Sequence, residues 1–257
     1  MDAERVRPEY VEDIFRSLDW LGLDWNLGPV SPEDFAQYYS QSLRLTEYNQ
    51  LLRQLGQQNG LLYACDCSRA QIAAHSVNGI YPGTCRNRHV SLDEPGVAWR
   101  IRVSEGTLVS ITEITGWEMD VRLDMAMGDF VVRRKNGLPA YQIASLSDDG
   151  QYGCNLIVRG ADLLPSTAAQ LFMAQQLGLN TFTQAIFYHH PLIRDAAGQK
   201  LSKSAGSASL QALRAAGQSP AVVWQAIAKA LQLPDQKADN AGDLLAQFSP
   251  GLLKGMS

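Results

Sequence analysis

Apolar residues recur at helical spacing near the start of the chain. The pattern predicts an amphipathic helix over residues 8–21, and Pro8 suits its first turn. The apolar residues that carry this pattern are Val11, Ile14, Phe15, Leu18 and Leu21. A second helix start follows at Ser31-Pro32-Glu33, where a capping side chain, a proline at the first position and an acidic residue occur together. From there the pattern predicts one long helix to about residue 56 or 60.

Beyond residue 61 the pattern changes to short β-rich runs separated by turns. Strands are predicted at 97–102, 108–114, 130–134, 156–159 and 186–188, and helices at 165–177 and 221–231. Because strands alternate with helices in the second half, the pattern indicates an α/β fold with a parallel sheet. Ligands of such a sheet bind beyond the carboxyl ends of its strands.

Composition and charge narrow the class of protein. The 257 residues are 46% hydrophobic, which is enough for one large domain or two smaller ones. The net charge is -4 and the sequence pI is about 5.6, so a polyanionic partner must meet a local patch such as Arg133-Arg134-Lys135 or the Arg86/Arg88/His89 cluster. No apolar stretch approaches the roughly 18 to 20 residues that span a bilayer, and the first residues lack a signal-peptide pattern. A cytoplasmic protein without membrane contact is expected.

Three of the four cysteines lie close together in the sequence. Cys65-x-Cys67 and, past a loop, Cys85 are predicted to form part of the donor set of a tetrahedral zinc site, since a reducing compartment disfavours disulfides. The sequence leaves the fourth ligand open between His75, His89 and Tyr81, which stands four residues before Cys85. The alternative is that the three cysteines are reduced and unrelated. The fourth cysteine, Cys154, is expected to be a buried small apolar residue.

The stretch GQKLSKSAGS combines lysines, hydroxyls and glycines. Lys200 and Lys203 supply point charges, serines supply directed donors, and Gly198 and Gly206 allow close approach of the backbone, which suits a loop that closes over phosphate. A solvated surface turn is the alternative interpretation. His189 and His190 precede this loop, where they either line a nucleotide pocket or are simply packed or solvent-facing.

Four segments together resemble a class I aminoacyl-tRNA synthetase of the glutamyl type. They are SLDWLGLDWNLGP, GDFVVRRKNGLPAYQIASLSDD, LIVRGADLLPSTAAQ and HHPLIRDAAGQKLSKS. The resemblance covers nearly the whole chain, and it is greatest to the short paralogue of this family that lacks an anticodon-binding domain. It implies an α/β, Rossmann-like catalytic domain with an inserted zinc-binding subdomain and a C-terminal helical segment.

The resemblance also implies a division of the chain into four parts. These are an N-terminal part of the Rossmann-like domain (1–60), the inserted zinc-binding subdomain (61–115), the second Rossmann half (116–190), and the KLSKS loop with C-terminal helices (191–257). The family's first strand and HIGH motif have no counterpart in this sequence, while Asp2 and Arg5 match the end of the acidic run that follows them. The expectation is that Met1 is an internal methionine of a longer gene product.

Residue roles follow from the same resemblance. Lys203 is expected to contact ATP, which binds with Mg²⁺, and Lys200 is expected to assist. Tyr141 and Arg159 match the family positions that bind glutamate, although a structural salt bridge is the alternative for Arg159. In the family a tyrosine completes three cysteines around one structural zinc, which favours Tyr81 as the fourth ligand.

The short length implies which reaction of the family to expect. The paralogue activates glutamate with ATP to give glutamyl-adenylate, and it then transfers the glutamyl group to queuosine in the anticodon loop of tRNA(Asp). The protein is expected to be a monomer. The alternatives are a truncated or degenerate relative that binds tRNA or a protein without catalysis, and a fragment of an ordinary glutamyl-tRNA synthetase.

Overall fold

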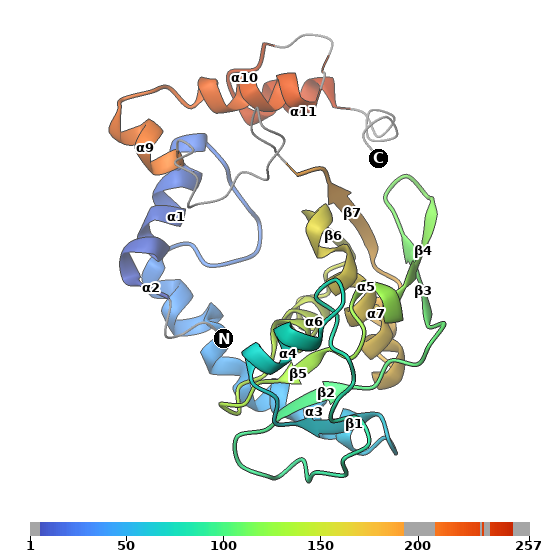
Figure 1. Cartoon of the computed structure of the whole chain (residues 1–257). Helices are drawn as coiled ribbons and strands as arrows, with labels where there is room; N and C mark the ends of the chain where they lie inside the picture. Colours follow the sequence, from blue (N-terminus) through green and yellow to red (C-terminus); the bar gives the residue numbers. More distant parts are fainter. Residues whose placement is uncertain (1–5, 193–208, 232, 234–236, 249–257) are drawn as a thin grey trace. The chain divides into compact units, whose positions relative to one another are not determined.

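The computed structural model describes residues 6–192, 209–231, 233 and 237–248. Asp2, Arg5, Lys200 and Lys203 lie outside these residues. The chain divides into two compact units (Figure 1), which are described separately below. The first unit is residues 41–189, and the second unit combines the chain up to Ser40 with the chain from His190 onward.

The second unit is helical. Helix α1 (Pro8–Leu21) has the predicted bounds, and it ends at Gly22 in the left-handed conformation that glycine tolerates best. Near the end of the chain lie α9 (Leu210–Ala215), α10 (Ala221–Ala230) and α11 (Ala241–Gln247). Trp224, Ala228, Leu233 and Ala238 form the buried core of this unit, against which Leu21 and Leu23 pack. An ion pair between Asp13 and Arg214 joins α1 to α9.

The long helix predicted from Ser31 onward is wrong in its length. Ser31 does cap α2 (Pro32–Asp34), accepting a hydrogen bond from the Asp34 N–H, and a π-helical turn η1 (Phe35–Tyr39) follows. The helix then stops, because Ser40 has extended backbone angles of φ −59° and ψ 132°. The chain enters the first unit through a 3-10 turn, η2 (Gln41–Arg44), and continues as α3 (Leu45–Gly56).

The strands of the first unit form three small sheets. Strands β1 (Leu62–Cys65), β2 (Ala98–Ile101) and β5 (Val131–Arg133) make an antiparallel sheet in the order β1-β2-β5. Strands β3 (Leu108–Thr112) and β4 (Glu118–Arg122) form an antiparallel hairpin, and β6 (Leu156–Gly160) pairs with β7 (Ile186–His190).

The five predicted strands therefore lie close to β2, β3, β5, β6 and β7, whereas β1 and β4 were not predicted, and one parallel sheet through all the strands is wrong for the described residues. A parallel bridge joins Glu113 to Phe187, whereas β1, β2 and β5 pair antiparallel, because residues 61–115 return on themselves before the chain reaches β5. The predicted boundaries at residues 60 and 115 remain a prediction.

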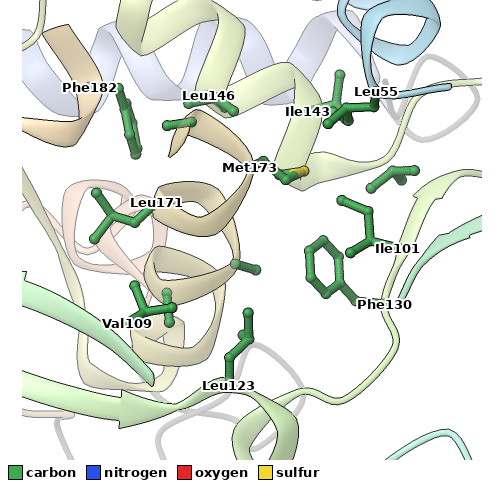
Figure 2. Packing of buried hydrophobic residues seen from close by; sticks show 14 of the residues in the cluster. Leu55, Ile101, Val109, Leu123, Phe130, Ile143, Leu146, Leu171, Met173 and Phe182 are labelled. Atoms are coloured by element: carbon green, nitrogen blue, oxygen red, sulfur yellow. The ribbon is translucent and has the colours of Figure 1, made fainter. Parts of the chain in front are cut away.

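Helices pack around a core centred on α7 (Leu164–Leu177). This helix is buried on nearly every side, which is typical of a helix in the middle of a core. Figure 2 shows Leu171 and Met173 among side chains from other elements, including Leu146 and Phe182. Burial of each such large apolar side chain contributes about 1.5–3 kcal/mol, so this cluster dominates the stability of the unit.

Four further α-helices and the 3-10 turn η3 (Ala161–Leu163) complete the described part of the first unit. The helices are α4 (Arg69–His75), α5 (Leu123–Ala126), α6 (Tyr141–Gln151) and α8 (Asn180–Thr183). Cys154 is half-buried and packs against the core, close to its expected environment. No helix in the described part of the chain has the length and apolar character needed to cross a bilayer.

Candidate functional site

Three cysteine thiols and one tyrosine hydroxyl converge in the first unit. The sulfurs of Cys65, Cys67 and Cys85 lie within 4.8 Å of one another, and those of Cys67 and Cys85 are 3.4 Å apart. The Tyr81 hydroxyl oxygen lies 3.5 Å from the Cys65 sulfur and 3.6 Å from the Cys67 sulfur, and it accepts a hydrogen bond from the Cys85 N–H at 2.8 Å. We call these four side chains the cysteine–tyrosine cluster.

Local sequence explains how the chain returns to this cluster. Cys65 ends β1, and Ser68 then starts α4 with a reciprocal capping box that includes Gln71. After α4, Asn78 and Gly79 both adopt positive φ, of 53° and 77°, in a turn closed by the bridge between Val77 and Ile80. This turn leads directly into Tyr81.

The distances of the Tyr81 oxygen fit a tetrahedral zinc ion, whereas the Cys67 and Cys85 sulfurs, 3.4 Å apart, lie closer together than such an ion would hold them. With Zn–S bonds of about 2.3 Å and a Zn–O bond of about 2.0–2.1 Å, tetrahedral geometry places two sulfurs about 3.8 Å apart and a sulfur about 3.5 Å from the oxygen. The distances from Tyr81 to Cys65 and Cys67 agree with this geometry. His75 and His89 are exposed, and neither belongs to the metal-ligating group that the described residues form.

Arginines surround the cluster and favour negative charge on it. The Arg100 guanidinium lies 3.8 Å from the centroid of the Tyr81 ring, and Arg100 is buried. Burial favours the neutral Cys65 thiol, but hydrogen bonds with Tyr81 and Arg100 outweigh it and lower the pKa of Cys65. Burial raises the pKa of Cys67 to about 11. A metal ion bound here must therefore displace the Cys67 proton at neutral pH.

Arg159 lies in a second cluster of polar side chains. It is on β6, is only 7% exposed, and is held by three residues. Its Nη1 donates to Gln170 Oε1 at 2.7 Å and to Thr167 Oγ1 at 3.3 Å, and its Nη2 lies 3.5 Å from Asp149 Oδ2. The salt bridge expected as the alternative for Arg159 is thus present, but Asp149 is its longest contact.

Two consecutive aspartates of α6 face different partners. Asp149 faces Arg159, and burial raises the pKa of Asp149 although Arg159 opposes this shift. Asp148 accepts hydrogen bonds from Gln41, Arg44 and Tyr48, at 2.9, 2.8 and 2.7 Å. These bonds join α6 to η2 and α3, so Asp148 anchors the helix that carries Asp149.

Tyr141 begins α6, the helix whose Asp149 contacts Arg159. It is 42% exposed and lines a cavity of about 480 Å³, together with Tyr81, Arg100 and Arg134. In the described residues no hydrogen bond joins Tyr141 to Arg159. The structure therefore brings Tyr141 to the same cavity as Tyr81, and Arg159 is not among the residues that line this cavity. Lys200 and Lys203 lie outside the described residues.

The basic segments singled out in the sequence are largely paired with acidic groups or aromatic rings. Arg86 pairs with Asp129 at 2.8 Å, and Arg88 pairs with Asp66 at 2.7 Å. Arg133 lies over the Trp99 ring, at 4.8 Å from its centroid.

Comparison with known proteins then identifies the family. The family described as tRNA synthetases class I (E and Q), catalytic domain, matches residues 1–238. The chain belongs to this family. It is therefore an aminoacyl-tRNA synthetase-like ligase, as the resemblance of the four sequence segments indicated.

Curated relatives agree over most of the chain. The chain is 39% identical over 224 residues to the glutamyl-Q tRNA(Asp) synthetase of Dechloromonas aromatica, covering 85% of this chain and 69% of that protein. It is 39% identical over 230 residues to the protein of the same name from Pseudomonas fluorescens, covering 86% and 71%. It is also 39% identical over 241 residues to the one from Ectopseudomonas mendocina, covering 90% and 76%.

Solved structures confirm the fold. A glutamate-tRNA synthetase from Elizabethkingia anophelis superposes with a TM-score of 0.74 at 19% identity, over 97% of this chain and 57% of that chain. A glutamate tRNA ligase from Elizabethkingia meningosepticum gives 0.70 at 20% identity, over 97% and 56%. The chain thus spans a little over half the length of these two structures.

Sequence reasoning missed several polar residues next to Arg159. Thr167 and Gln170 on α7 contact it directly, and His189 contacts Thr167. For His189 the sequence offered a place in a nucleotide pocket or a packed or solvent-facing position, and in the structure its side chain is buried. The sequence signal that could have indicated them is the presence of Thr167 and Gln170 in an otherwise apolar helix, because polar groups that are buried need hydrogen-bond partners.

Proposed function

We propose that the protein activates glutamate with ATP and transfers the glutamyl group to queuosine in the anticodon loop of tRNA(Asp). In the first step a glutamate carboxylate oxygen attacks the α-phosphorus of ATP, a new P–O bond forms, and the bond to the β-phosphate breaks. Glutamyl-adenylate and pyrophosphate are the products. In the second step the acyl group moves to the nucleoside and AMP leaves. The names of the curated relatives support this choice of substrates.

The observation that carries the proposal is the preorganised guanidinium of Arg159. It is buried, and Gln170 and Thr167 fix its Nη1 at 2.7 and 3.3 Å. A fixed guanidinium suits recognition of a carboxylate, because its N–H donors are already oriented before the ligand arrives. Tyr141 is proposed as the second glutamate contact, and Lys203 with Lys200 as the cations that stabilise the phosphates of ATP with its Mg²⁺.

We also propose that Cys65, Cys67, Cys85 and Tyr81 hold one structural zinc ion. The ion would supply a cross-link between the end of β1 and the segment that follows α4. The Tyr81 hydroxyl oxygen has the spacing of a tetrahedral site to the Cys65 and Cys67 sulfurs, and all three sulfurs lie within 4.8 Å of one another. The division of the chain into parts 1–60, 61–115, 116–190 and 191–257 belongs to this proposal.

Glutamate-dependent exchange of pyrophosphate into ATP tests the activation step. We expect exchange with glutamate, none with aspartate, and loss of at least about 100-fold of the rate in Lys203→Ala, because one electrostatic contact to the transition state contributes that much. Thr183→Val, which removes a hydroxyl remote from both clusters, is a control expected to keep the rate. Correctly folded protein without glutamate-dependent exchange would contradict the proposal and favour a non-catalytic binding protein.

A further inference from the structure

A buried pair formed by a carboxylate and an imidazole is connected to Arg159 through one hydroxyl group. Glu113 follows β3 and His189 is on β7, and their side chains are 13% and 5% exposed. The two chain segments are joined because the Ile114 N–H donates to the Phe187 carbonyl at 2.8 Å. This backbone contact brings His189 Nδ1 to 2.7 Å from Glu113 Oε1.

The hydroxyl of Thr167 connects this pair to Arg159. Its oxygen lies 2.8 Å from His189 Nε2 and 3.3 Å from Arg159 Nη1, and it is 3.3 Å from the Leu163 carbonyl oxygen. Thr167 is completely buried on α7. One hydroxyl therefore stands between an imidazole ring and the guanidinium proposed to bind glutamate.

Counting donors and acceptors shows that Arg159 can donate to the Thr167 hydroxyl whether the His189 ring is neutral or charged. A hydroxyl has one proton and two lone pairs, and Arg159 offers only donors. We take the arrangement in which Nδ1 donates to the facing Glu113 oxygen, 2.7 Å away. With a neutral ring, Nε2 accepts the Thr167 proton; with a charged ring, Nε2 donates and the Thr167 proton goes to Leu163. A lone pair of Thr167 remains for Arg159 in both cases.

The bonds at Arg159 are unequal. Nη1 has two close oxygen partners, whereas the contact of Nη2 with Asp149 is long, at 3.5 Å. The Thr167 contact thus holds one side of the guanidinium and leaves the Nη2 side with capacity for a carboxylate. Fixing one side of an arginine reduces the entropy lost when the other side binds.

We propose that Glu113 and His189 are positioning residues that act through Thr167 to orient Arg159 for glutamate. This inference rests on the proposed function, since it takes Arg159 as a glutamate contact. It assigns a role in substrate affinity to two residues that themselves stay buried and do not touch the substrate.

The test compares Thr167→Val with Thr167→Ser in pyrophosphate exchange. Valine keeps the shape and removes the hydroxyl, so we expect the KM for glutamate to rise about tenfold or more, with kcat and the KM for ATP changed less than about threefold. Serine restores the hydroxyl and is expected to restore the KM. Isothermal titration with glutamate alone provides a readout that does not depend on activity.

A second pair of variants covers the case in which Thr167→Val does not fold. His189→Gln can place an amide near the Nε2 position and keep the Thr167 contact, whereas His189→Asn can keep only the contact with Glu113. A raised KM in the asparagine variant but not in the glutamine variant supports the inference. Equal KM values for the wild type, Thr167→Val and His189→Asn would overturn it.

Arg159→Gln separates this inference from the proposed function. If Arg159→Gln leaves glutamate activation intact, the proposed role of Arg159 fails and the inference fails with it. If Arg159→Gln abolishes activation while the Thr167 and His189 variants keep the wild-type KM, only the positioning role is wrong.

Discussion

The position of Tyr81, the fourth residue of the cysteine–tyrosine cluster, could be seen only in the structure. Sequence reasoning left His75, His89 and Tyr81 open until a family resemblance favoured the tyrosine. In the structure the Tyr81 hydroxyl lies 3.5 Å from the Cys65 sulfur, while both histidines are exposed. Spacing along the chain could not show this, because the turn at Asn78 and Gly79 decides where the next side chain points.

Metal analysis of purified protein tests this site. We expect near-stoichiometric zinc in the wild type and its loss in Cys65→Ser, whereas the control Cys154→Ser keeps it, since Cys154 is remote from the cluster. Tyr81→Phe keeps the ring under Arg100 and is expected to lower the zinc affinity about tenfold or more in a chelator competition. Unchanged affinity in Tyr81→Phe together with zinc loss in His89→Ala would contradict the assignment of Tyr81.

Arg159 illustrates a residue whose type was predictable and whose environment was not. Sequence resemblance pointed to the position, but the bonds that hold the guanidinium come from β6, α6 and α7 together. Glu113 and His189 stand 76 positions apart and meet only because the end of β3 bonds to β7. No periodicity or motif within one segment carries that information.

At the scale of elements, the local sequence pattern was sufficient to predict the position of a helix or strand when one of its faces is apolar. The predicted helix over 8–21 has the observed bounds, and the predicted strand over 108–114 contains β3. Helix α6 was missed because its buried positions, Ile143, Ala144 and Leu146, are followed by polar residues only. Its second half is held by side-chain bonds to α3 and η2, which depend on tertiary structure.

Asp148→Asn tests how much these bonds stabilise α6. Removing the charge leaves buried Arg44 without its carboxylate, so we expect a loss of about 3 kcal/mol in the free energy of unfolding. Asp93→Asn, in an exposed loop, is the control and is expected to change stability by less than about 0.5 kcal/mol. Denaturant unfolding measures both, and equal midpoints would contradict the anchoring role.

The hydrogen bonds of Asp148 also predict how the free energy of unfolding depends on pH. Burial opposes ionisation of Asp148, but hydrogen bonds from Arg44, Tyr48 and Gln41 outweigh it and lower the pKa of this carboxyl group. A carboxyl whose folded pKa lies below its unfolded value stabilises the protein above the unfolded value, about 3.9, and the stability is lost as the pH falls further. In Asp148→Asn this part of the acid sensitivity is expected to disappear.

At the scale of the whole molecule, the family and the fold agree. The class I family covers residues 1–238, and the fold of a glutamate-tRNA synthetase superposes on 97% of the chain. The sequence order of motifs predicted this class, but it did not predict three separate small sheets or a boundary between compact units at Ser40. Both features depend on which distant segments pair, and a periodic pattern does not specify pairing partners.

The net charge of -4 also bears on the whole molecule. A tRNA must be met by local cations, and several arginines in the first unit already pair with acidic side chains. Binding to tRNA is therefore expected to weaken as the salt concentration rises, with a slope that grows with the number of phosphates that these cations contact.

Transfer of labelled glutamate to purified tRNA tests the central claim most directly. With ATP present, we expect the label on tRNA(Asp) that carries queuosine, recovered in the anticodon-loop fragment after nuclease digestion. The same tRNA without queuosine is the matched control and should remain unlabelled. Label at the 3′ end of tRNA(Glu), or no label on any tRNA from protein that supports glutamate-dependent pyrophosphate exchange, would contradict the account.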